Sequence, residues 1–214
     1  MDLLKTLLDL FLHLDTHLVE FTTQYGVWVY ALLALVVFCE TGLVVTPFLP
    51  GDSLLFVVGT LAAGGLLDFG TAAAVLFVSA VVGDSVNYAI GNAIGPRVYA
   101  RPDSRWLRQE HLTRTRAFFE RHGGKTIVLA RFVPIVRTFA PFVAGVGSMH
   151  YRRFLAYNVF GAAVWVLLFM TAGVLFGQLP LVKNNLTLIA LGIVVVSLLP
   201  LLVHQLRARN VGAA

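Results

Sequence analysis

The sequence predicts an all-α integral membrane protein that forms a single membrane domain over residues 1–214. Hydrophobic residues make up 58% of the 214 residues and charged residues only 13%. The mean hydropathy is +0.82, and several windows approach the roughly 20 apolar residues that a spanning helix needs. The length leaves no room for a separate soluble domain. The single cysteine, Cys39, excludes an intrachain disulfide, and its apolar setting favours packing.

The first element is an amphipathic helix that begins near residue 3. Its leucines recur at intervals of three and four residues, with charged residues between them, which is typical of a helix lying at a membrane interface. Acidic residues interrupt the apolar run, so we do not expect a cleaved signal peptide. His13 and His17 are one turn apart, but no further ligands accompany them. We therefore predict no metal site and no cofactor.

The next elements alternate between whole and broken helices. We predict spanning helices at about 71–95, 154–177 and 186–206, and an interfacial helix at about 104–121. Two segments between them, 27–64 and 126–147, contain helix breakers: the run TPFLPGD in the first, and Pro134 and Pro141 in the second. Non-helical backbone survives at membrane depth only where protein covers it or it lines a wet cavity. Both segments are therefore predicted to be re-entrant hairpins.

These elements form two copies of one pattern: interfacial helix, re-entrant hairpin and spanning helix. The first copy covers about 3–95 and the second about 104–177, and the helix at 186–206 is extra. Each copy crosses the membrane once, so the second begins on the opposite side and the repeat is inverted, as in many transporters. The alternative is that short apolar segments merely resemble one another.

The net charge of +5 is concentrated in one segment. Eight lysine and arginine residues and three acidic residues fall within 97–125. The positive-inside rule then places this segment in the cytoplasm, together with the C-terminal Arg207 and Arg209, in a multi-pass chain. The basic charge is thereby explained by topology, so membrane lipids are predicted partners and nucleic acid is not.

Five charged residues fall inside segments assigned to the membrane. Each unpaired charge at the bilayer centre costs roughly 2.5–3.5 kcal/mol, so these groups must pair, face water or bind something. The stretch RFVPIVRTFAPFVAG carries two of them, and the planar fork of arginine matches phosphate geometry. We predict that these two arginines bind a phosphate group. A static ion-pair network is the alternative. The five are Glu40, Asp52, Asp84, Arg131 and Arg137.

The spanning helix VVGDSVNYAIGNAIG carries two adjoining stripes. One stripe holds Asp84, Tyr88 and Asn92, and the other holds Asn87 among glycines at four-residue spacing. Small residues at this spacing let helices approach closely, so we assign most of these positions to packing. Asn158, Gly161 and Trp165 repeat the theme in the second copy. Asp84, Tyr88 and Asn158 are predicted to support the site.

Several runs together resemble the bacterial DedA family over about residues 24–180. They are Glu40, FLPGDSLL, GDSVNYAIGNAIG, FFERHGGKTIVLARFVPIVRTFAPFVAGVGSM and YNVFGAAVW. The resemblance implies a protein of the bacterial inner membrane that takes part in undecaprenyl phosphate recycling in the cell envelope. It also implies dependence on the proton motive force and a link to resistance against membrane-acting antibiotics. By resemblance, the functional acidic pair is Glu40 and Asp52, and the functional arginine pair is Arg131 and Arg137.

The leading hypothesis is a flippase that moves undecaprenyl phosphate, or a similar polyprenyl phosphate, from the outer to the cytoplasmic leaflet. Inward movement of negative charge costs roughly 2.3 kcal/mol per 100 mV, so protons carried by Glu40 or Asp52 would assist it. The alternative is a proton- or cation-coupled carrier of a small soluble solute. An enzyme is not predicted, because no serine or cysteine nucleophile lies beside a base. A scaffold would leave the membrane charges unexplained, and a homo-oligomer stays open.

Overall fold

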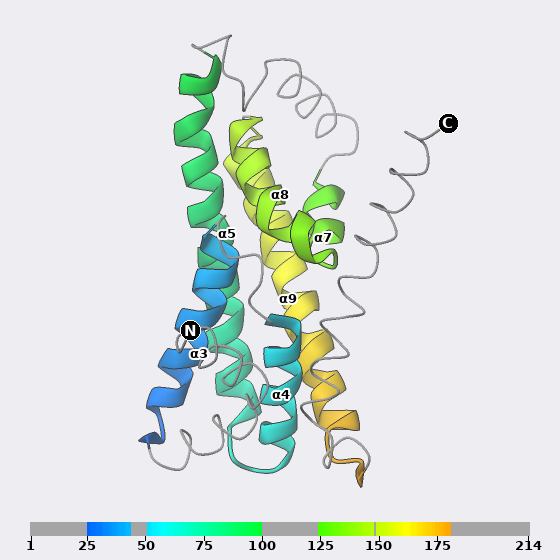
Figure 1. Cartoon of the computed structure of the whole chain (residues 1–214). Coiled ribbons are helices and arrows are strands. Elements are labelled where there is room, and N and C mark those ends of the chain that lie inside the picture. The colour runs from blue at the N-terminus through cyan, green and yellow to red at the C-terminus, as the bar shows by residue number, and fades with distance from the viewer. Residues whose placement is uncertain (1–24, 44–50, 100–123, 148, 181–214) are drawn as a thin grey trace, which may run out of the picture. The chain divides into compact units, whose positions relative to one another are not determined.

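The structure, a computed structural model, describes residues 25–43, 51–99, 124–147 and 149–180. Within these ranges all regular secondary structure is helical, as the sequence predicted (Figure 1). The predicted helices near residue 3, at 104–121 and at 186–206 lie outside the described residues, as do His13, His17 and most of the basic segment 97–125. The helices are α3 (Trp28–Gly42), α4 (Gly51–Ala63), α5 (Phe69–Tyr99), α7 (Lys125–Ala130), α8 (Pro134–Val146) and α9 (Tyr151–Phe176).

Two of these helices, α5 and α9, are long and apolar enough to cross a membrane. Their apolar spans are Phe69–Gly95, with 27 residues, and Tyr151–Phe176, with 26 residues. At a rise of 1.5 Å per residue each span is about 40 Å long, which exceeds the roughly 30 Å of a bilayer's hydrocarbon core. The spanning helices predicted at 71–95 and 154–177 are therefore present as helices of the required length and composition.

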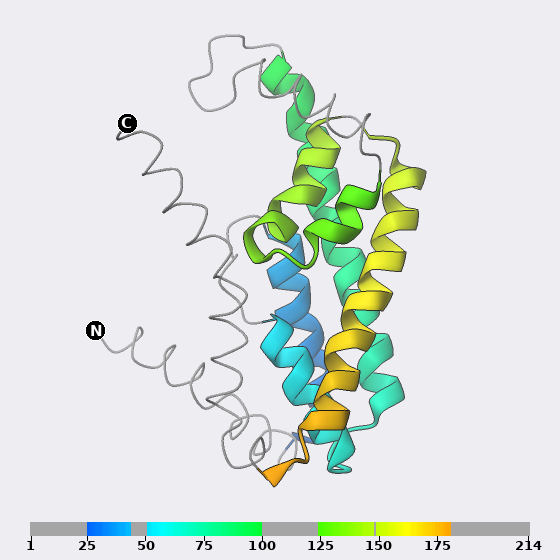
Figure 2. The same cartoon turned by 90° about the vertical axis from the view of Figure 1, so that its right-hand side faces the viewer.

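Helices α7 and α8 form a helical hairpin (Figure 2). Its tip is a turn over residues 131–133, in which the N–H groups of Phe132 and Val133 donate to the carbonyls of Leu129 and Ala130 at 3.2 and 2.9 Å. Val133 has φ −118° and ψ 107°, the extended backbone that a following proline favours. Pro134 then starts α8, where its missing N–H would have had no helical acceptor.

Pro141 does not break the second segment, and the prediction that it would is wrong. It lies inside α8, which continues to Val146. A proline in a helix interior removes the hydrogen bond to the carbonyl four residues earlier, here that of Arg137. The helix continues past this lost bond, and the Gly147 N–H still donates to the Val143 carbonyl at 2.8 Å. Only Pro134 marks a turn.

The first broken segment, 27–64, consists of two separate helices, α3 and α4. Helix α3 ends near Gly42, and the Leu43 N–H donates to the Cys39 carbonyl at 3.1 Å. Asp52 lies in the first turn of α4, where the helix dipole favours a negative charge. Of the predicted break, Thr46 to Asp52, the last two residues begin α4, and the others lie outside the described residues.

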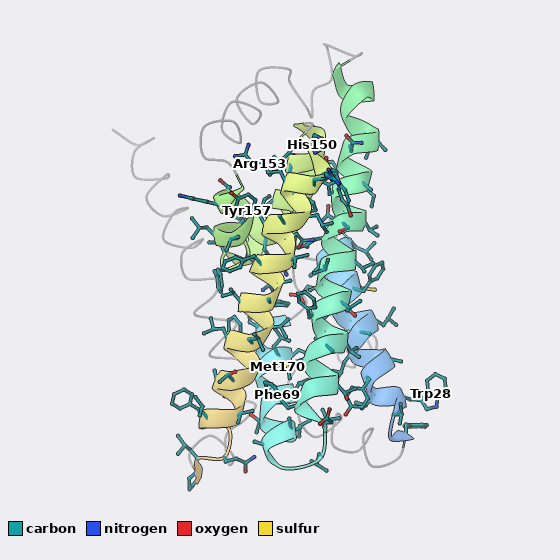
Figure 3. The ribbon with its side chains drawn as sticks, turned by 180° about the vertical axis from the view of Figure 1, so that it is seen from behind. Trp28, Phe69, His150, Arg153, Tyr157 and Met170 are labelled. Atoms are coloured by element: carbon teal, nitrogen blue, oxygen red, sulfur yellow. The ribbon has the colours of Figure 1, made fainter. Side chains whose placement is uncertain are left out.

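The chain divides into two compact units, and their boundaries in the sequence fall within α3, α5 and α9. In the first, which we call the α4 unit, α4 packs against the C-terminal part of α9, which carries Met170 (Figure 3). A Cβ added at Gly59 would overlap the Met170 backbone, and one added at Gly173 would overlap the Phe56 backbone. Glycine therefore sets this close approach. The α4 unit comprises described residues 25–31, 51–72 and 168–180.

The second unit, which we call the arginine unit, comprises described residues 32–43, 73–99, 124–147 and 149–167. Here α5 and α8 also meet through glycines, because Gly91 lies against the Phe142 backbone and Gly145 against the Tyr88 backbone. The glycine stripe of α5 packs as predicted. A buried apolar cluster completes the core, made by Tyr88, Ile127, Ala130, Ala140, Ala144 and Phe154.

Candidate functional site

Arg131 lies at the tip of the α7–α8 hairpin and is held between α5 and α9. Its Nη2 donates to the Asp84 carboxylate on α5 and to Asn158 Oδ1 on α9, the latter at 2.7 Å. All three side chains are buried. Asn158 Nδ2 in turn donates to the Val81 carbonyl at 3.1 Å, which fixes the direction of the amide. The arginine is therefore satisfied by one charged and one neutral acceptor.

Arg137 forms a second buried ion pair. It lies in the first turns of α8, and its Nη2 donates to Glu40 Oε1 near the end of α3. The side chains of Arg137 and Glu40 are only 10% and 1% exposed. Ion pairs this deeply buried cost desolvation energy that apolar packing would avoid, so they need a reason other than stability.

Trp165 joins the two pairs. Both guanidinium carbons lie over its ring, that of Arg131 at 5.6 Å and that of Arg137 at 5.5 Å from the ring centroid. The indole on α9 is 1% exposed. A guanidinium within about 6 Å of an indole face gains a cation–π attraction that is larger in a desolvated setting. One buried ring thus holds both arginines in the same small region.

Asn87 forms hydrogen bonds to both backbone segments that carry the Arg137–Glu40 pair. Its Nδ2 donates to the Thr41 carbonyl at 3.0 Å and to the Thr138 carbonyl at 2.8 Å. Thr41 directly follows Glu40 on α3, and Thr138 directly follows Arg137 on α8. The amide is fully buried. Asn87 therefore fixes the register in which this carboxylate and this guanidinium meet.

The two ion pairs line one small cavity of about 10 Å³, roughly the room that a single water molecule needs, so an anion enters only as a carboxylate moves away. Two guanidinium groups and two carboxylates face it, and its other lining residues are uncharged. Such a site suits an anion that exchanges places with a carboxylate. The lining residues are Glu40, Thr41, Asp84, Ile127, Arg131, Arg137, Thr138, Ala140, Pro141 and Trp165.

The structure brings only some of the sequence-predicted site residues together. It brings Glu40, Arg131 and Arg137 together with Asp84, and Asn158 reaches the same arginine. Tyr88 lies elsewhere: its hydroxyl donates to the Met149 carbonyl, and its ring stacks on Phe154 at 4.5 Å. Asp52 belongs to the α4 unit.

Sequence reasoning missed four residues that build the site. From the sequence, Asn87 is assigned to packing and Trp165 is named without a role, and neither Thr41 nor Thr138 is singled out. Two signals were available. Asn87 is one turn from Asp84 on α5, and Trp165 is two turns from Asn158 on α9, so each shares a helix face with a polar residue of the site. Among the described residues no group of three or more His, Cys, Asp or Glu side chains is arranged to hold a metal.

Comparison with known proteins identifies the family. The VTT domain profile matches residues 49–175, which is more than half of the chain. The chain is 55% identical to Protein DedA of Escherichia coli K12 over 215 residues, which cover 100% of this chain and 98% of that protein. The chain belongs to the DedA family. The resemblance seen in the sequence is confirmed, and the protein is a membrane protein.

More distant relatives share the membrane assignment. An uncharacterized membrane protein of Mycobacterium leprae is 44% identical over 178 residues, covering 82% of this chain and 80% of that protein. The inner membrane protein YqjA of Escherichia coli K12 is 33% identical over 185 residues, covering 84% and 81%. No solved structure matches the chain.

Proposed function

We propose that this protein is a multi-pass transporter of the bacterial inner membrane that moves undecaprenyl phosphate, or a similar polyprenyl phosphate, to the cytoplasmic leaflet with the help of protons. The observation that carries the proposal is the cavity in which Arg131 and Arg137 are each paired with a buried carboxylate. Paired guanidinium groups form a phosphate site with defined geometry. Membership of a membrane protein family supports a lipid as the bearer of that phosphate.

The proposed coupling is an exchange between carboxylate and phosphate. With Glu40 ionised, Arg137 is occupied and the site is closed to an anion. Protonation of Glu40 removes the charge that holds the arginine, and a phosphate then takes that place. Release of the phosphate returns the proton. We also propose a proton-coupling role for Asp52, by resemblance to the family, so that at least one of the two acids carries protons.

We also propose the inverted repeat of re-entrant hairpins. Single cysteines at Gly64 and Lys125, in a Cys39→Ser background, are expected to react with impermeant reagents from opposite sides of the membrane. Both positions are exposed, whereas Gly124 is unsuitable because a Cβ added there would overlap the Tyr157 ring. Labelling of both positions from one side would contradict the inverted repeat.

The transport proposal is tested in proteoliposomes by leaflet-resolved movement of undecaprenyl phosphate, with and without a pH gradient. The wild-type protein should move the lipid faster with the gradient, and the double variant Glu40→Gln, Asp52→Asn should lose much of this dependence. The amides keep the shape of the protonated acids, and folding is checked by size-exclusion chromatography. Folded wild-type protein that moves no lipid under either condition would favour the small-solute carrier. Gradient dependence as large in the double variant as in wild type would remove the proton role of these two acids.

A further inference from the structure

The charges of the cavity cancel in the state that the structure describes. Arg131 and Arg137 contribute two positive charges, and Asp84 and Glu40 contribute two negative charges when ionised. The charged groups that face Asp84 come from two neighbouring elements: Arg131 at the hairpin tip and Arg137 on α8. The groups that α9 adds, Asn158 and Trp165, are uncharged. The site is therefore neutral when empty.

A phosphate monoester upsets this balance. Its second pKa is about 6, so it carries close to two negative charges in mildly alkaline solution. An uncompensated charge in a buried site costs several kcal/mol, so the loaded site is stable only if its total charge stays near zero. Two protons restore neutrality, and the cavity offers two carboxylates to take them.

We propose that loading a phosphate monoester takes up two protons, one on Glu40 and one on Asp84, which makes Asp84 a second proton acceptor of the site. This rests on the proposed function and adds to it a stoichiometry and a residue. Each carboxylate gains one proton from water, and no covalent bond of the lipid is made or broken. On release of the phosphate the protons leave and the two ion pairs re-form.

The neutral partners of the arginines support this exchange. When Asp84 is protonated, Arg131 keeps its hydrogen bond to Asn158 Oδ1 at 2.7 Å. Both guanidinium groups keep the Trp165 ring beneath them. Asn87 holds the backbones of Thr41 and Thr138 through their carbonyls, whose hydrogen bonds do not depend on the charge of Glu40. The arginines therefore stay in place while their counter-charges change.

The test measures proton uptake during binding of farnesyl phosphate, a short polyprenyl monoester, to the purified full chain in detergent. Calorimetry in buffers of different ionisation enthalpy gives the number of protons taken up, at about pH 8, roughly two units above the second phosphate pKa. We expect about two protons for wild type and about one each for Glu40→Gln and Asp84→Asn, by the neutrality argument. The exposed control Asp68→Asn should keep about two protons, and Asp52→Asn is the arm that distinguishes Asp84 from Asp52 as the second proton acceptor.

The outcomes separate the inference from the function on which it rests. If wild type binds the phosphate with uptake of about one proton, and Asp84→Asn takes up the same number, the inference is overturned. The proposed phosphate site would be unaffected by that result. A drop to about one proton in Asp52→Asn would overturn the inference by assigning the second proton to Asp52. This measurement does not require the Asp84→Asn variant to fold. Absence of binding by folded wild type to both farnesyl and undecaprenyl phosphate would overturn the proposed function itself.

Discussion

The α4 unit and the arginine unit hold their helices together in different ways. In the α4 unit, glycines let α4 approach α9 to backbone contact, and the Thr60 hydroxyl donates to the carbonyls of Phe56 and Gly173 at 3.1 and 3.2 Å. The arginine unit has similar glycine contacts but adds two buried ion pairs. The described contact between α4 and α9 in the first unit is made by glycines and a threonine hydroxyl.

The difference argues for a role of the arginines beyond stability. Apolar side chains of similar volume often match or exceed a buried ion pair in stability. The chain nevertheless places both pairs around one cavity, with neutral partners that keep the arginines oriented. The contrast supports a site in which charge is exchanged, and it is open to direct tests.

The largest expected effect is that of breaking one ion pair while leaving its partner buried. Asp84→Leu should lower the free energy of unfolding by about 3–5 kcal/mol, because Arg131 remains charged and buried. The double variant Asp84→Leu, Arg131→Met should recover most of this stability while losing phosphate binding. Unfolding in detergent micelles and farnesyl phosphate binding measure the two effects. A double variant as unstable as the single one would favour the static ion-pair network.

The next effect concerns close packing in the α4 unit. Gly59→Ala places a Cβ into the Met170 backbone, so α4 and α9 must move apart. Overpacking of this kind typically costs about 1–3 kcal/mol of unfolding free energy. Transport per folded molecule should be unchanged, because Gly59 does not line the cavity. Gly64→Ala is the matched control, since it is exposed and its nearest neighbour is 3.5 Å away. Equal destabilisation by both substitutions would refute the packing argument.

The sequence predicted the helices where one local property determines them. The apolar runs of α5 and α9 fixed both spans to within a few residues, and Pro134 marked the hairpin turn. Pro141 was misread because a proline only removes one donor, and the rest of α8 maintains the helix. Whether a proline ends a helix or is accommodated within it depends on the neighbouring turns and on tertiary packing. A rule that considers one residue at a time includes neither.

The sequence predicted the site only in part, because pairing is long-range. The partners of Arg131 and Arg137 lie 47 and 97 positions away in the chain, and three acids competed for two arginines. Charge compensation alone could not choose among them. Asn87 was assigned to packing because small residues surround it on its helix, and Trp165 was given no role. Each nevertheless shares a helix face with a charged or polar residue of the site.

A smaller effect separates charge from geometry within the arginine unit. Arg131→Lys and Arg137→Lys keep the positive charge but lose the planar fork. Losing one hydrogen bond to a charged group costs about 1.5 kcal/mol or more, so farnesyl phosphate binding should weaken at least about tenfold in each variant. Lys125→Arg, at an exposed position of α7, is the control. Wild-type affinity in both lysine variants would mean that charge alone binds the phosphate.

The smallest expected effect concerns an exposed carboxylate of the α4 unit, in contrast to the buried carboxylates of the site. Asp68 precedes α5, and its Oδ1 accepts a hydrogen bond from the Thr71 N–H at 2.7 Å, as a helix cap does. The Thr71 side chain and backbone hold the pKa of Asp68 below its ordinary value of 3.8. Because this pKa is lower in the folded chain than in the unfolded chain, the charge stabilises the fold above about pH 4, and the effect is lost as pH falls further.

Asp68→Asn keeps a capping side chain without the charge, so its melting temperature should lie slightly below that of wild type at neutral pH and converge with it in acid. A difference that stays constant down to about pH 3 would show that the charge of Asp68 does not contribute.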